Sequence, residues 1–238
     1  MKKELCILSI IIAISILAVG CLDNDFEEQP TIFSLTLTIP DGDQWLVSDT
    51  GDSLRILNFT MLVDSIEVVK QGLDNDIFEP DPRLVSFSTL GLSEESSIGA
   101  GGLTGGRYEA VEFTVLQPDM DTSITDENLV TRDSAGNVTA SYSFAVTGII
   151  IMEGCEPEDF RFRSQVNRRV KYGFMEVVEM PETLGTLNVQ LRGNWQNWFV
   201  DPVNTNQFLN PNSSANRNQI EQSIIDNFEI ATFDVGGI

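Results

Sequence analysis

Hydrophobic and polar residues alternate with a period of two along most of the chain. In the segment 33–39 the apolar residues are separated by Ser and Thr, which is the pattern of a strand with one buried face. The same alternation recurs at 85–87, 111–115, 138–146, 160–162 and 187–191. Strands therefore dominate the predicted secondary structure.

The segment 57–68 combines two opposite alternations. Every second residue from 57 to 63 is apolar, but Ile66 and Val68 have the other parity. A regular strand would expose half of these side chains to water. We therefore expect a β-bulge near Asp64 and Ser65, because an extra residue moves the side chains that follow it to the opposite face.

One segment near the C-terminus has the period of a helix. Ile220, Ile224 and Phe228 recur every four residues, and the polar run 212–214 suits a helix N-cap. Residues 229–235 predict a last strand. The expected fold is mainly β, an antiparallel β-sandwich with one C-terminal helix.

The N-terminus resembles a bacterial lipoprotein signal peptide. Two lysines precede the apolar stretch Leu5–Val19, and Gly20 precedes Cys21. This stretch has fifteen residues, fewer than the roughly 20 that span a bilayer as a helix. Cleavage before Cys21 and attachment of lipid to its thiol would supply the anchor instead. Ala18 stands where such signals favour Leu, and an uncleaved N-terminal anchor is the alternative.

Three regions follow from this interpretation. Residues 1–20 form the signal peptide, 21–30 form an acidic tether, and 31–238 form the β-sandwich domain. If that domain is not single, the polar loop 118–136 is the place where it would divide. We expect an exported protein that lipid on Cys21 holds to the outer membrane or the cell membrane, facing the periplasm or the cell exterior.

The cysteines suggest no disulfide within the chain. Cys6 would leave with the signal peptide and Cys21 would carry lipid, so Cys155 would be the one cysteine left as a thiol. We expect Cys155 to be small, buried or inert, because no histidine or lysine stands near it. A reactive thiol or an intermolecular bridge is the alternative.

Composition narrows the chemistry further. The chain has 36 acidic and 14 basic residues, a formal net charge of −22, and no histidine. Electrostatic repulsion opposes binding to nucleic acid or to a bare anionic membrane. Without histidine, Ser-His-Asp triads, histidine-bound zinc, copper or haem, and H-E-x-x-H proteases are excluded. We expect no enzymatic activity and no cofactor, apart from Ca²⁺ in one alternative.

Acidic side chains gather in three predicted loops. They are Asp41, Asp43, Asp49 and Asp52; Asp74, Asp76, Glu79 and Asp81; and Asp119, Asp121, Asp126 and Glu127. The second cluster is the candidate calcium site, because Ca²⁺ takes about six to eight oxygen ligands and alternate acids can supply them. None of the three clusters has the spacing of an EF-hand, and solvated loops are the interpretation that we favour.

Two other segments have residues that could bind a ligand. The glycine-rich run 99–106 could cradle a phosphate, but strand alternation follows it, so we expect loops and a tight turn. Trp195 and Trp198 could bind a ligand by stacking on a sugar, or could anchor a protein partner. The interpretation that we favour places both tryptophans in the core, and leaves the protein or glycan partner unknown.

The order of three segments resembles a group of β-sandwich surface lipoproteins, which includes domains of unknown function and MbnP-like proteins. The segments are 57–69, 84–87 and 106–115, and the last has the pattern G-x-Y-x-x-[IVL]-x-[FL]. The resemblance implies a β-sandwich at the cell envelope. MbnP-like proteins are associated with copper handling beside a haem-containing partner, but we do not extend that function to a chain without histidine.

Together these features predict a lipid-anchored β-sandwich that serves as a non-catalytic binding or structural module. The alternative function is that of a calcium-dependent adhesin or a carbohydrate-binding lipoprotein. Both hypotheses attach the protein to a membrane through Cys21.

Overall fold

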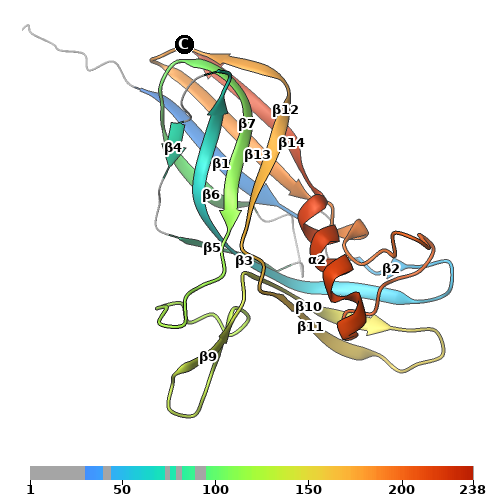
Figure 1. Cartoon of the computed structure of the whole chain (residues 1–238). Coiled ribbons are helices and arrows are strands. Elements are labelled where there is room, and N and C mark those ends of the chain that lie inside the picture. Colours follow the sequence, from blue (N-terminus) through green and yellow to red (C-terminus); the bar gives the residue numbers. More distant parts are fainter. Residues whose placement is uncertain (1–29, 40–43, 73–75, 79–81, 89–94, 238) are drawn as a thin grey trace, which may run out of the picture.

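Two β-sheets form the body of the protein (Figure 1). The computed structural model of the protein describes residues 30–39, 44–72, 76–78, 82–88 and 95–237. In this part of the chain, a two-stranded hairpin and one short α-helix accompany the sheets. The prediction of a mainly β fold with a single C-terminal helix is confirmed.

The smaller sheet has four strands in the order β14-β13-β1-β6. Its strands are β1 (Thr31–Thr38), β6 (Glu95–Leu103), β13 (Gly185–Gly193) and β14 (Phe228–Gly237). β1 pairs in parallel with β13, so this pair departs from the expected antiparallel arrangement. The other two pairs of this sheet are antiparallel.

The larger sheet is organised around β3 (Ser53–Lys70), which runs through both halves of the molecule (Figure 1). The order is β11-β10-β3-β7-β12, and β2, β4 and β5 also pair with β3. These strands are β2 (Leu46–Val47), β4 (Asp76–Phe78), β5 (Arg83–Ser88), β7 (Gly106–Val115), β10 (Phe144–Ile151), β11 (Glu158–Ser164) and β12 (Arg168–Met180). β8 (Val130–Arg132) and β9 (Val138–Ser141) form a separate hairpin.

The expected bulge in β3 is present. Ser65 has a φ of 52°, and the pairing of β3 with β7 shifts between Asp64 and Glu67. Because of this shift, Val63 and Ile66 both join the core, although a regular strand would place them on opposite faces. The predicted change of parity is confirmed.

A second irregularity in β3 lies at Leu57, and the sequence pattern does not reveal it. Asn58 pairs with Thr147 and Ile56 pairs with Gly148, which leaves Leu57 without an opposite residue on β10. Ile56 is buried, whereas Leu57 is only partly buried. The expectation that Leu57 shares the buried face of the strand is therefore wrong.

Phe59 of β3 lies in an aromatic cluster at the centre of the core. The distance between ring centroids is 5.0 Å to Trp198, 5.9 Å to Phe228 and 6.4 Å to Phe144. Aromatic pairs at such distances add to the stabilisation from apolar burial. Residues on both sides of the loop 118–136 contribute to one hydrophobic core.

The C-terminal helix begins with a 3-10 turn. η2 (Ser214–Asn216) leads into α2 (Arg217–Asp226), where Ile220 and Ile224 are buried as expected, while Phe228 belongs to β14. Ser213 of the predicted run 212–214 occupies the N-cap position of η2, but no side-chain hydrogen bond caps η2 or α2. A helix long and apolar enough to cross a membrane is not found among the described residues.

Two segments fold differently from the prediction. The segment 138–146 is not one continuous strand, because β9 ends before Tyr142 and β10 begins at Phe144. The glycine-rich run 99–106 is largely extended rather than looped, because its first part completes β6 and Gly106 begins β7. A short turn at 104–105 joins these two strands.

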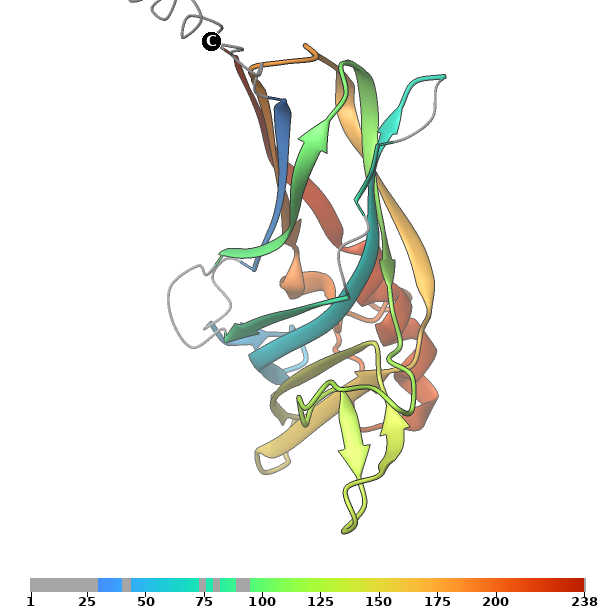
Figure 2. The same ribbon diagram turned by 90° about the vertical axis from the view of Figure 1, so that its left-hand side faces the viewer.

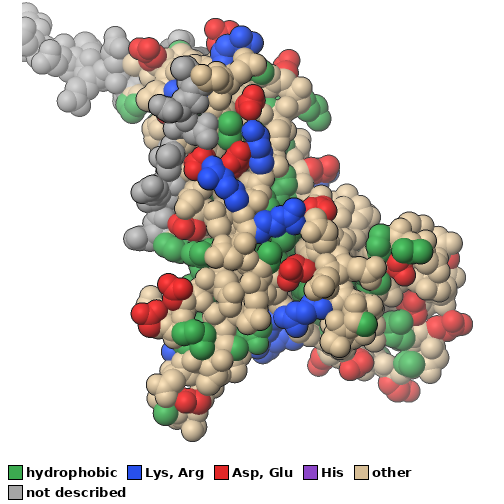
Figure 3. Space-filling model, in the orientation of Figure 1, with side chains coloured by type: hydrophobic (Ala, Val, Ile, Leu, Met, Phe, Trp, Pro, Cys, Tyr) green, Lys and Arg blue, Asp and Glu red, His purple; other side chains and the backbone are tan. Residues whose placement is uncertain are grey.

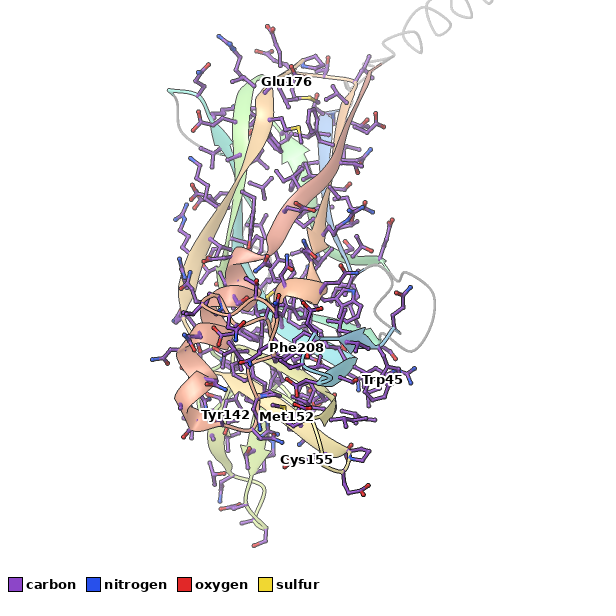
Figure 4. All side chains as sticks on the ribbon, turned by 90° about the vertical axis from the view of Figure 1, so that its right-hand side faces the viewer. Trp45, Tyr142, Met152, Cys155, Glu176 and Phe208 are labelled. Carbon is purple, nitrogen blue, oxygen red and sulfur yellow. The ribbon has the colours of Figure 1, made fainter. Side chains whose placement is uncertain are left out.

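The molecule has two distinct ends (Figure 2). The start of β1 and the end of β14 both pair with the start of β13, and we call this the terminal end. The hairpins β8-β9 and β10-β11 lie at the opposite end, which we call the loop end. Figure 4 labels Glu176 near the terminal end and Cys155 at the loop end.

Gly148 provides a test of the packing between β3 and β10. A β-carbon at this position would lie 2.2 Å from the carbonyl oxygen of Arg55 and 2.6 Å from the ring of Phe160. We expect Gly148→Ala to lower the free energy of unfolding by about 1–3 kcal/mol, the usual effect of overpacking, in urea denaturation. Gly173→Ala is the control, since its β-carbon would meet nothing closer than 3.9 Å. Equal losses in the two variants would contradict the described packing.

Candidate functional site

A pocket of about 210 Å³ lies between β11 and the start of α2. We call it the arginine pocket, and its lining residues are Arg161, Phe162, Arg163, Pro211, Asn212, Ser213, Ser214 and Arg217. None of these lining residues is acidic, although the whole chain has a net charge of −22. The pocket therefore differs in charge from the protein that contains it.

The alternation of β11 supplies two of the arginines. Phe160 and Phe162 are buried, so the side chains of Arg161 and Arg163 leave the strand on the opposite face. The two phenylalanine rings lie 5.3 Å and 6.4 Å from the ring of Phe199, which fixes the strand against the core. β11 is an edge strand, and its free side meets the chain that precedes α2.

That preceding chain forms the other wall of the arginine pocket. Asn212 Nδ2 donates a hydrogen bond to the carbonyl oxygen of Asp159 at 3.4 Å, which ties the wall to β11. Arg217 Nη2 donates to the carbonyl oxygen of Arg163 at 2.5 Å. Arg217 is the first residue of α2, and burial of Ile220 sets the rotation of the helix that presents it.

Arg163 is held by the β8-β9 hairpin and the loop before it. Its guanidinium donates to Thr131 Oγ1 at 3.1 Å and to the carbonyl oxygen of Glu127 at 2.7 Å. The same group lies 4.8 Å from the ring centre of Tyr142, which Figure 4 places toward the loop end. Arg163 therefore contributes a fixed positive charge, whereas the other two arginines are exposed and can reach a ligand.

Among the described residues, no ion pair involves the three arginines of the arginine pocket. Arg169 and Lys171 of β12, by contrast, pair with glutamates of β3 and β7. Figure 3 shows basic and acidic side chains intermixed over the face of the larger sheet. Glu221 lies one helical turn after Arg217 but forms no ion pair with it in the described structure, and instead accepts a hydrogen bond from Ser164. Guanidinium groups without a carboxylate partner favour an anionic ligand.

Two hydroxyl groups complete the lining of the arginine pocket. Ser213 occupies the N-cap position of η2, but its hydroxyl makes no capping hydrogen bond. Ser214 brings a second hydroxyl to the lining. Hydroxyl and guanidinium groups donate hydrogen bonds, and the positive end of the α2 dipole lies on the same side. The arrangement is suited to binding an anion.

The candidate calcium site falls largely outside the described residues. Asp74, Glu79 and Asp81 are not described, and neither is Cys21, so the calcium and lipidation predictions stay predictions. Asp76 is described as the first residue of β4. Within the described part of the chain, no group of three or more acidic or cysteine side chains could hold a metal ion.

Asp76 belongs to a hydrogen-bonded network. Its carboxylate accepts hydrogen bonds from the hydroxyl of Tyr108 and from the backbone N–H of Thr104, the latter at 3.0 Å, and lies 3.5 Å from Lys70 Nζ. Burial alone would raise the pKa of Asp76, but these hydrogen bonds and the lysine charge outweigh it and lower the pKa. Burial and the bond to Asp76 raise the pKa of the Tyr108 hydroxyl.

Trp195 and Trp198 lie in the core. Their exposed fractions are 1% and 0%, and the ring of Trp198 packs against Phe59 and Phe228. Neither indole is available to stack on a sugar, so the proposed aromatic platform is not formed. The interpretation of both tryptophans as core residues agrees with the structure.

Cys155 lies at the loop end (Figure 4). It is a free, exposed cysteine in the turn between β10 and β11, where its N–H donates to the carbonyl oxygen of Met152 at 2.9 Å. The expectation that Cys155 is buried is wrong, because the tip of a hairpin offers no core to pack against, and the expectation that its thiol is inert stays a prediction.

Sequence reasoning missed the arginine pocket. The alternation at 160–162 predicts a strand with Arg161 and Arg163 on its outward face. This pair of outward arginines is the feature of the sequence that could have indicated the pocket. Arg217 follows 54 residues after Arg163, and no local pattern brings the two together.

Comparisons with known proteins give little further guidance. No protein family and no curated protein matches the sequence. Among solved structures, MbnP from Methylosinus trichosporium is similar with a TM-score of 0.36 and 11% identity. That match covers 88% of this chain and 98% of the MbnP chain. No family membership follows from this similarity.

The network around Asp76 predicts a pH-dependent contribution to stability. Since folding lowers the pKa of Asp76, its stabilisation is complete above the unfolded value of about 3.9 and is lost as the pH falls through the folded value. We expect Asp76→Asn to lower the free energy of unfolding by about 1–2 kcal/mol at pH 7. The difference from the wild type should shrink below about pH 4.

Urea denaturation across this pH range measures the effect of Asp76→Asn. The exposed Asp121 is the control, and Asp121→Asn should change the unfolding free energy little at any pH. A deficit in Asp76→Asn that stays constant down to pH 2 would contradict the described network.

Proposed function

We propose that this protein is a lipid-anchored module of the cell envelope that binds a ligand or partner without transforming it. The anchor is the lipid on Cys21, and the binding surface is the arginine pocket. The position of the arginine pocket relative to the start of β1 supports this proposal.

The arginine pocket and the start of the domain lie at opposite ends of the molecule. β1 begins at the terminal end, whereas the pocket involves the edge strand β11 at the loop end (Figures 1 and 2). A lipid on Cys21 would attach the protein to the membrane through the chain that enters the terminal end, which is the end opposite the pocket.

The chemistry of the lining favours binding over catalysis. Guanidinium groups stay protonated in proteins and cannot accept a proton as a general base. The remaining polar side chains of the lining are those of Asn212, Ser213 and Ser214, which form hydrogen bonds but do not exchange protons readily near neutral pH. Such a site orients and retains an anionic group.

The anchor is tested by replacing the cysteine that would carry it. We expect Cys21→Ser to abolish incorporation of labelled fatty acid and to release the protein from the membrane fraction of the native cells. Cys155→Ser should leave both labelling and fractionation unchanged, because Cys155 lies in the turn between β10 and β11 and is not the cysteine that would carry the lipid. Labelling and membrane retention of Cys21→Ser protein would overturn the anchor.

A further inference from the structure

We propose that the arginine pocket binds a phosphate or sulfate group carried by a larger ligand. This inference deepens the proposed function and rests on it only in taking the arginine pocket as the binding surface. It does not depend on the lipid anchor.

The number and position of the donors favour a tetrahedral oxyanion. Arg161 comes from β11 and Arg217 from α2, so two exposed guanidiniums approach from different walls, with the hydroxyls of Ser213 and Ser214 beside them. One guanidinium already satisfies both oxygens of a carboxylate in a bidentate pair. A phosphate or sulfate ester presents three terminal oxygens in different directions, which suits donors from several elements.

The charges closest to the arginine pocket act most strongly on a group inside it. At physiological ionic strength, charges more than about 8 Å apart are largely screened from one another. Acidic residues farther than this from the pocket act weakly on a group inside it, where three arginines and no acids form the lining. Arg163 adds to this local charge, and its buried Nε has no hydrogen-bond partner within the described residues.

The size of the pocket limits what enters it. Its volume of about 210 Å³ is below the roughly 300–1,000 Å³ of pockets that enclose drug-sized ligands. A single oxyanion group fits such a space, while the rest of the ligand would extend over the exposed loops of the loop end. The ligand would thus be held by its charged group.

NMR titration of the whole protein with inorganic phosphate and with inorganic sulfate tests this inference. Both ions stabilise folded proteins without specific binding, so the readout is the amide chemical shifts of residues 161–163 and 212–217 at constant ionic strength. We expect saturable shifts confined to these residues. Shifts that do not saturate, or that spread evenly over the protein, would overturn the proposal.

Variants that each remove the charge of one arginine test whether the arginine pocket binds the anion. Arg161→Gln and Arg217→Gln should each weaken binding about tenfold or more, because each removes a charge-assisted donor. Arg192→Gln, at an exposed position on β13, should leave the affinity unchanged. Arg161 is exposed, so its variant keeps the fold even if Arg217→Gln disturbs α2. Unchanged affinity in Arg161→Gln would contradict the proposal.

Titrations with acetate, glucose 6-phosphate and glucose 6-sulfate define the chemical class of the bound group. Acetate should bind more weakly than either inorganic ion, and equal binding of acetate would overturn the preference for a tetrahedral group. Glucose 6-phosphate and glucose 6-sulfate identify the source of the group, since the ester that binds more tightly is the one recognised. If neither ester binds more tightly than its free ion, the inference of a larger ligand is wrong.

The pocket and the anchor can be separated experimentally. We expect Cys21→Ser protein to bind phosphate or sulfate with wild-type affinity, whatever its behaviour in membrane fractionation. Loss of the anchor would then leave the anion site intact, and loss of anion binding in Arg161→Gln protein would leave membrane attachment intact.

Discussion

The rest of the structure depends on which side chains of β3 face the core. Within the described part of the chain, five strands pair directly with β3, and the buried apolar residues on the two sides of Ser65 have opposite parity. Only a bulge allows both halves to face one core, and Ser65 forms it with a φ of 52°. The left-handed conformation costs a non-glycine residue about 1–2 kcal/mol, which burial of the residues that follow outweighs.

The position of the arginine pocket depends on β3. The first half of β3 pairs with β10, and β10 in turn pairs with β11. With its phenylalanines in the core, β11 presents Arg161 and Arg163 outward, toward the chain that leads into α2. A change of register in β3 would therefore be transmitted through two strand pairs to the pocket.

Local patterns in the sequence predict much of the fold. Alternation places the buried strands, the conflict of parity at 57–68 predicts the bulge, and the spacing of Ile220 and Ile224 predicts the helix. The second irregularity at Leu57 escapes prediction, because it depends on the pairing with β10. The arginine pocket escapes for a similar reason: Arg217 reaches β11 only through tertiary packing.

The free energy of unfolding of a protein that lacks Ser65 tests the central role of β3 most directly. Deletion removes the extra residue and turns Ile66 and Val68 toward water, at a cost of about 1.5–3 kcal/mol each. We predict a loss of several kcal/mol or failure to fold, whereas Ser65→Gly, measured in the same way, should be at least as stable as the wild type. Wild-type stability of the deletion protein would contradict this account.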